Sequence, residues 1–191
     1  MPTVGEAKRV ARHAARAARK SIPPEKRAVL SQIICGRIEG LAVWDSARVL
    51  TAFLPIQSEV DLRPLLMGGP LGSRVLGIPR TGNDTMSFDA IDLADPEALV
   101  VGEFGIAVAS VRAPIDPTTV DLVLVPLLAF DAHGNRLGAG RAFYDRWLPA
   151  AVNAFRLGVA FSAQEIESVP IDAHDVRLHA VVTEKGLHAC R

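Results

Sequence analysis

The sequence has few cysteines and no surplus of charge of either sign. Only Cys35 and Cys190 are present among 191 residues, and they form no metal-binding pattern, so we expect two reduced thiols and no structural disulfide. Lysine and arginine together number 21, as do aspartate and glutamate, so the formal net charge is zero. A neutral chain has no overall attraction for nucleic acid or for an anionic membrane surface.

Long apolar runs are missing as well. No stretch of about 18 apolar residues occurs, and the N-terminus has no apolar segment of the kind found in signal peptides. We therefore expect a soluble, cytoplasmic protein. Hydrophobic residues nevertheless make up 49% of the chain and charged residues 22%, which suits one domain over residues 1–191 with a sizeable core.

Segments with helical and strand-like patterns alternate along the chain. This alternation predicts an α/β fold, a layered Rossmann-like arrangement with a largely parallel sheet flanked by helices. The expected helices cover residues 5–20, 25–41 and 62–67, and the proline-containing segment 109–119 is expected to cross the surface. The expected strands cover residues 47–54, 74–78, 86–88, 120–130, 156–161 and 180–183.

The most informative segment is 120–147, in which an apolar strand leads into a glycine-rich loop and then into a helix. Gly134, Gly138 and Gly140 lie in the loop. Glycines allow the main chain to approach a ligand closely, and the first N–H groups of a helix attract an anion. This order of elements is typical of a phosphate-binding site. The alternative is a tight, solvent-facing loop whose glycines serve only turns.

Two side chains in this segment extend the phosphate interpretation. Arg136 offers a forked cation, and Asp145 offers an oxygen ligand suited to magnesium. The spacing matches neither the P-loop motif nor the dinucleotide-binding fingerprint. The segment therefore indicates a nucleoside triphosphate site of another type.

Residues 134–146, GNRLGAGRAFYDR, resemble the signature of the 5-formyltetrahydrofolate cyclo-ligase family, also called methenyltetrahydrofolate synthetase. The preceding VPLLAFD at 125–131 is similar to that family too. The resemblance extends over nearly the whole chain, because shorter motifs follow in the family's order. These are Lys8-Arg9 with Arg12, Phe53-Leu54-Pro55, Glu59-Val60-Asp61, Pro79-Arg80, Phe104-Gly105-Ile106, residues 157–161, Gln164, Val169-Pro170, His174-Asp175 and residues 182–184.

The resemblance implies an ATP- and Mg2+-dependent ligase that converts 5-formyltetrahydrofolate to 5,10-methenyltetrahydrofolate and releases ADP and phosphate. In that reaction ATP phosphorylates the formyl oxygen, a folate nitrogen attacks the activated carbon, and phosphate leaves as the ring closes. Phosphoryl transfer of this kind depends on positioning and charge neutralisation. No serine or cysteine nucleophile is needed, and the sequence shows no such constellation.

The resemblance also implies roles for individual residues. Arg136 and Tyr144 are the implied catalytic pair, and Asp145 and Asp175 are the implied magnesium ligands. Leu54, Glu59 and Phe143 are the implied folate-binding residues. The implied ATP-binding residues are Lys8, Arg9, Arg12, Gly134, Arg136, Leu137, Gly138, Ala139, Gly140, Arg141, Ala142, Phe143 and Tyr144.

Each assignment has a structural alternative. Leu54 and Phe143 are also typical of core packing, Glu59 of a surface loop, and Asp175 of a capped turn. His174 is expected to be a hydrogen-bonded structural residue.

The first helix carries a basic face at helical spacing. Lys8 and Arg12 are expected to reach phosphates, whereas Arg16, Arg19 and Lys20 are expected to form a solvated face. No aromatic platform accompanies these residues, so nucleic-acid binding is disfavoured. We expect a monomer whose partners are small molecules. Two other functions stay open: a paralogue that binds folate or nucleotide without cyclisation, and a basic-helix interaction protein.

The sequence departs from the family's usual pattern at two places. The family usually has a Glu-Pro pair where Ala107 and Val108 follow Ile106, and it usually has glycine at the position of Ala142. We expect Ala142 in the first helical turn, where alanine is the strongest helix former. In a left-handed conformation alanine would instead cost about 1–2 kcal/mol, and we would expect the loop to be distorted or inactive.

Overall fold

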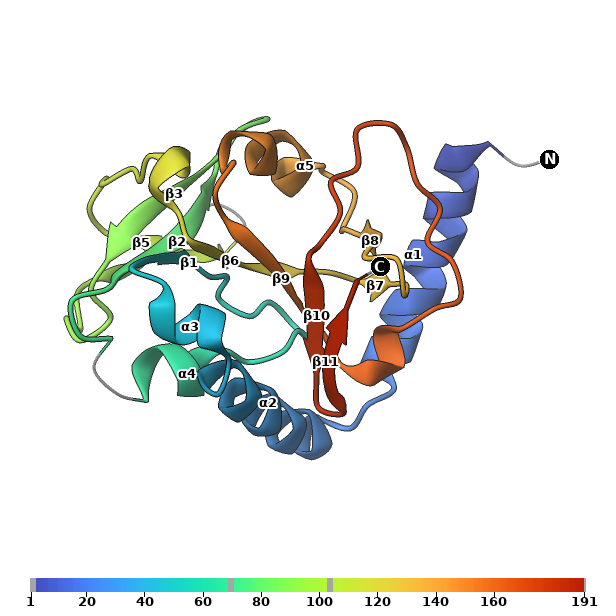
Figure 1. Ribbon diagram of the computed structural model, residues 1–191, viewed down its shortest axis with the longest axis horizontal. Coiled ribbons are helices and arrows are strands. Elements are labelled where there is room, and N and C mark those ends of the chain that lie inside the picture. The colour runs from blue at the N-terminus through green and yellow to red at the C-terminus, as the bar shows by residue number, and fades with distance from the viewer. Residues whose placement is uncertain (1–2, 69–70, 103–104, 191) are drawn as a thin grey trace.

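The computed structural model describes residues 3–68, 71–102 and 105–190 (Figure 1). Phe104, which belongs to one of the family-like motifs, lies outside these residues. The main sheet has seven strands in the order β11-β10-β9-β6-β1-β2-β3. Neighbours from β10 through β2 pair in parallel, whereas the edge strands β11 and β3 pair antiparallel. The largely parallel sheet confirms the predicted fold class.

The elements have the following bounds. The main-sheet strands are β1 (Val49–Thr51), β2 (Val75–Thr81), β3 (Met86–Ile91), β6 (Leu122–Pro126), β9 (Phe155–Val159), β10 (Ala180–Thr183) and β11 (Gly186–Ala189). Two small sheets pair β4 (Leu99–Val101) with β5 (Ala107–Ala109) and β7 (Ala129–Phe130) with β8 (Arg136–Leu137). The helices are α1 (Val4–Lys20), α2 (Pro24–Glu39), α3 (Ala42–Ser46), α4 (Arg63–Met67) and α5 (Phe143–Trp147), with 3-10 turns η2 (Pro117–Thr119), η3 (Leu148–Ala150) and η4 (Ser162–Gln164).

The side chains of β6 show how the layers form. Leu122 and Leu124 face the cluster that contains the buried residues of α2, α3 and α4. Val123 and Val125 face the opposite cluster, which contains Trp147 of α5. All four side chains are fully buried, as expected for a central parallel strand covered on both faces. Figure 1 accordingly shows α2, α3 and α4 on one side of the sheet and α5 on the other.

Helix α1 lies at one end of the molecule, beside β7 and β8 (Figure 1). It begins with a capping box, in which Thr3 and Glu6 exchange hydrogen bonds. Ala15 is buried in a small apolar cluster with Leu128 and Val169. This contact brings the basic helix against the segment that follows β6.

The predicted strand over 120–130 is divided in the structure. It forms β6, and after a short break its end pairs in a separate hairpin, β7 with β8. Strands β4 and β11 were not predicted, and β5 extends into the segment expected to cross the surface. Among the described residues, no helix is both long and apolar enough to span a bilayer.

Candidate functional site

Asp131 organises the turn between β7 and β8. Its Oδ1 accepts hydrogen bonds from the backbone N–H groups of His133 (3.0 Å) and Asn135 (3.1 Å), and its Oδ2 accepts from Val169 N–H at 3.0 Å. Burial alone would raise the pKa of Asp131, but the donors of Val169, Asn135 and His133 outweigh it and hold the pKa below its usual value. Gly134 closes the turn with φ of 76°. These hydrogen bonds fix the conformation of the turn from which the glycine-rich loop begins.

A partly buried ion pair lies next in the loop, between the buried Arg136 and the half-buried Asp145. Arg136 is 6% exposed, and its Nη2 lies 2.7 Å from Oδ1 of Asp145. The Nη1 atom of Arg136 donates to the carbonyl of Val176, and the Val176 N–H donates to Oδ1 of Asp145 at 3.1 Å. The pair therefore joins β8, α5 and the segment before β10.

A second ion pair ties α1 to the same segment. The Nζ atom of Lys8 lies 2.5 Å from Oδ2 of Asp175. Asp175 is adjacent in sequence to Val176, which contacts Asp145. The structure therefore brings Asp145 and the backbone beside Asp175 together, although their positions in the sequence are 30 residues apart.

The glycine-rich loop lies against the basic face of α1. Arg12 donates to the carbonyl of Gly138 at 3.0 Å, and Arg16 donates to the carbonyl of Ala139 at 3.1 Å. Gly140 has φ of 112°, and a Cβ atom there would lie 3.5 Å from the guanidinium of Arg12. A Cβ atom at Gly138 would meet nothing within 4 Å. The loop therefore combines open backbone with neighbouring cations, which suits a polyphosphate.

Ala142 is left-handed, and the prediction that it lies in the first helical turn is wrong. Its φ of 50° and ψ of 24° place it before α5, at the N-cap position. Helix α5 begins only at Phe143, because the chain must turn sharply out of the loop. Arg146 N–H donates to the Ala142 carbonyl at 3.1 Å, so the first turn of the helix is still hydrogen-bonded.

Two arginines flank the ring of Phe143. The guanidinium carbons of Arg141 and Arg146 lie 5.1 and 5.4 Å from the ring centroid. The same arginines donate to the carbonyls of Asn83 and Asp84, at 3.4 and 3.1 Å, in the turn between β2 and β3. Phe143 is half-buried.

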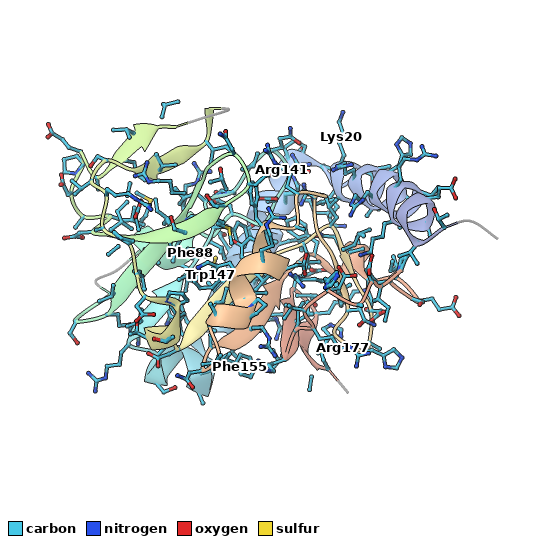
Figure 2. All side chains as sticks on the ribbon, turned by 90° about the horizontal axis from the view of Figure 1, so that it is seen from above. Lys20, Phe88, Arg141, Trp147, Phe155 and Arg177 are labelled. Carbon is cyan, nitrogen blue, oxygen red and sulfur yellow. The ribbon has the colours of Figure 1, made fainter. Side chains whose placement is uncertain are left out.

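The hydroxyl of Tyr144 is buried and has no hydrogen-bond partner among the described residues. Burial raises the pKa of this hydroxyl, and the negative charge of Glu59 raises it further. The hydroxyl is therefore a neutral donor. The ring of Tyr144 packs edge-on against Phe88, which also contacts Trp147 with centroids 4.6 Å apart (Figure 2). An unpartnered buried hydroxyl costs about 1–3 kcal/mol, which a ligand acceptor would relieve.

Glu59 lies in the loop after β1, at the carboxyl edge of the sheet, where ligands of open α/β sheets bind. Its Oε2 accepts from the N–H of Ile56 at 3.1 Å, and its Oε1 lies 3.6 Å from Nη1 of Arg19. Burial raises the pKa of Glu59, while the Ile56 N–H and Arg19 oppose part of that rise. Leu54 is half-buried against the cluster on the α2 face.

The prediction of a solvated basic face is wrong for Arg19. Arg19 is 6% exposed and faces the Glu59 loop. Arg16 is exposed but bonds the glycine-rich loop, whereas Lys20 is exposed, as expected. In the sequence, Lys8, Arg12 and Arg16 are four residues apart and either Arg19 or Lys20 can continue this stripe, so the spacing does not show which of the two turns inward.

Two of the implied ATP-binding residues, Leu137 and Arg9, do not face the open part of the glycine-rich loop through a contact seen among the described residues. Leu137 is buried in the small apolar cluster with Ala15, and Arg9 is exposed on α1.

The residues present fit a magnesium ion whose coordination is completed by substrate phosphates and water. Within the described residues, no group of three or more histidine, cysteine, aspartate or glutamate side chains is placed to hold a metal ion. Mg2+ is commonly held by one or two carboxylates together with substrate phosphates and water. Asp145 and Asp175, beside cations and an open glycine loop, match that pattern.

The sequence model of the 5-formyltetrahydrofolate cyclo-ligase family matches residues 4–184. The chain belongs to this family. A relative from Mycolicibacterium smegmatis, named 5-formyltetrahydrofolate cyclo-ligase, is 33% identical over 189 residues, covering 91% of this chain and 92% of the relative. The Escherichia coli K12 protein of that name is 29% identical over 174 residues, covering 86% and 93%.

The fold agrees with this membership. The solved structure of the Aquifex aeolicus 5,10-methenyltetrahydrofolate synthetase aligns with a TM-score of 0.82 and 31% identity, covering 98% of this chain and 93% of that one. The corresponding Mycoplasma pneumoniae structure aligns with a TM-score of 0.72 at 21% identity, which shows the shared fold. The layered arrangement is therefore the cyclo-ligase fold.

Proposed function

We propose that this protein is an ATP- and Mg2+-dependent ligase that converts 5-formyltetrahydrofolate to 5,10-methenyltetrahydrofolate. The observation that carries the proposal is the convergence of the glycine-rich loop, the partly buried pair of Arg136 with Asp145, and Lys8 and Arg12 of α1. Family membership over residues 4–184 supports the same activity. ATP and the folate are its proposed small-molecule partners, and we expect a monomer.

Each part of the arrangement has a place in the reaction. The open backbone at Gly138 and the cations Lys8, Arg12 and Arg136 would bind the triphosphate and offset the charge on the transferred phosphoryl group. Asp145 and Asp175 would hold Mg2+, which supplies further charge neutralisation when bound.

The other side of the site would hold the folate. Glu59 would accept hydrogen bonds from the aminopyrimidine edge of the pterin, and Phe143 would stack on its ring, with Leu54 as apolar support. The neutral hydroxyl of Tyr144 would donate to an oxygen of the reacting group. The γ-phosphoryl group of ATP would pass to the formyl oxygen and ADP would leave. The neighbouring folate nitrogen would then attack the activated formyl carbon and lose its proton, and the C–O bond would break as phosphate leaves.

The left-handed Ala142 supports a second candidate, a paralogue that binds one ligand without cyclisation. A basic-helix interaction protein is disfavoured because the basic face of α1 lies against the glycine-rich loop and the Glu59 loop, through Arg12 and Arg19, and is not turned outward.

An absorbance assay for methenyltetrahydrofolate tests the proposal directly. We expect product only when ATP, Mg2+ and 5-formyltetrahydrofolate are all present. Calorimetry with ATP-Mg2+ and with the folate then separates the alternatives. Binding of both ligands supports the enzyme, binding of one without product supports the paralogue, and binding of neither supports the interaction protein.

A further inference from the structure

Arg19 is a buried cation at the end of a helix that is otherwise largely exposed. It and Ala15 are the buried residues of α1. A buried guanidinium is costly unless it is paired and hydrogen-bonded. Among the described residues, the partners of the Arg19 guanidinium lie in one loop: its Nε donates to Ser58 Oγ at 3.1 Å, and its Nη1 lies 3.6 Å from Oε1 of Glu59.

The loop that Arg19 contacts is tight and strained. Gln57 has φ of 55°, a left-handed conformation that is uncommon for a residue with a side chain. Glu59 N–H donates to the Ile56 carbonyl at 3.2 Å, and the Glu59 side chain turns back to accept from Ile56 N–H. Such strain persists only where surrounding contacts hold the backbone. Arg19 supplies two of those contacts from a different element.

We infer that Arg19 is a positioning residue for folate recognition, which holds the loop after β1 and keeps Glu59 as an anion facing the site. The inference rests on the proposed function, because it assigns Glu59 to the pterin. Helix α1 would then serve both halves of the site. Lys8, Arg12 and Arg16 contact the phosphate side, and Arg19 contacts the folate side.

Besides the Ile56 N–H, Arg19 is the group that favours the charged form of Glu59. Tyr144, from α5, is neutral, and Arg136 acts on the Tyr144 hydroxyl. Arg16 and Arg27 lie near Arg19, and Arg27 donates to the carbonyl of Ile22 at 2.6 Å. Arg19 is therefore the cation that opposes the effect of burial on the pKa of Glu59. Without it, the pKa of Glu59 rises further, so the carboxylate becomes protonated at higher pH, and a protonated carboxyl is a weaker acceptor that also presents an O–H donor.

The first test compares Arg19→Met with Lys20→Met, which removes an exposed cation from the same helix; Figure 2 shows Lys20 extending away from the body of the protein. For Arg19→Met we expect the KM for 5-formyltetrahydrofolate at pH 6 to rise about tenfold, while the KM for ATP stays within about twofold. The acidic limb of kcat/KM for the folate should move to higher pH. Lys20→Met should match the wild type. Arg19→Lys should partly restore folate affinity.

A double-variant comparison separates this role from general stabilisation. Glu59→Gln removes the carboxylate that Arg19 keeps charged, so adding Arg19→Met should then raise the folate KM clearly less than it does in the wild-type background, and what remains comes from the Ser58 contact. If Arg19→Met has the same effect in both backgrounds, with an unchanged pH profile, the inference is wrong. Ser58→Ala, which removes one acceptor of Arg19, provides a milder variant if Arg19→Met fails to fold.

A measurement without turnover keeps the two proposals distinguishable. The titration of the Glu59 carboxyl carbon, followed by NMR in the unliganded protein, should move to higher pH in Arg19→Met and stay in place in Lys20→Met. An unchanged titration overturns the inference whether or not the protein is active. A wild-type protein that makes no methenyltetrahydrofolate overturns the proposed function instead.

Discussion

The Nη2 atom of Arg136 and the Oδ1 atom of Asp145 lie 2.7 Å apart, and this partly buried contact joins the glycine-rich loop to α5. We expect Arg136→Ala to lower kcat/KM for ATP, with a loss of about 2–4 kcal/mol of transition-state stabilisation, because a preorganised charge is lost. Arg136→Lys keeps the charge but lacks the forked geometry that reaches both Asp145 and Val176, so it should recover only part of the loss. Unchanged turnover at limiting ATP would remove Arg136 from the site.

Ala142 offers a test of backbone strain. Among the described residues, only Gln57 and Ala142 have positive φ without being glycine. Ala142→Gly should raise the free energy of unfolding by about 1 kcal/mol, because glycine adopts this conformation without the cost of a Cβ atom. Urea denaturation measures the change.

The matched control for Ala142 lies in the same loop. Ala139→Gly, at an exposed position without positive φ, should not stabilise the protein. We expect Ala142→Gly to change turnover little. A large increase would indicate that the chain has drifted from its family's chemistry and would favour the paralogue.

Magnesium dependence tests the two aspartates. Asp145→Asn and Asp175→Asn should each raise the Mg2+ concentration needed for half-maximal activity by about tenfold or more, because a carboxylate ligand is lost. Asp172→Asn, an exposed change near Asp175, is the control and should leave the requirement unchanged. Activity that persists in a chelator would exclude the metal itself. If only one aspartate variant shifts the requirement, joint ligation is wrong.

Asp131 should make stability depend on pH. Its pKa is depressed in the folded state, so its contribution is present above the unfolded value of about 3.9 and is lost as pH falls through the folded value. Asp131→Asn should lower the free energy of unfolding at pH 7 by about 1–3 kcal/mol, because hydrogen bonds to a charged acceptor are lost. The difference from wild type should shrink below about pH 4. A difference that stays constant from pH 7 to pH 3 would contradict this account.

The sequence predicted the layers and the position of the glycine-rich loop because both depend on local patterns. The buried run that forms β6 and the glycine spacing around Gly138 are visible without tertiary contacts. The break after β6 was missed because two-residue strands such as β7 carry too little pattern to recognise. The left-handed Ala142 depends on how the chain leaves the loop, and the inward turn of Arg19 depends on a loop nearly 40 residues away, so neither could be predicted from local propensity.

Helix α1 is attached to the molecule mainly through charged and polar groups. Ala15 is the one buried apolar side chain of α1, with Ala11 partly buried against the same cluster, whereas α2 buries Ile34, Cys35 and Ile38. Ion pairs and polar contacts of partly exposed groups weaken as salt is added, while apolar contacts do not. High ionic strength should therefore weaken the attachment of α1 at salt concentrations that leave the sheet intact. The contacts of α1 with the glycine-rich loop and with the Glu59 loop should weaken together. A bound polyanion would act in the opposite direction, so that substrate itself would complete the attachment of the helix.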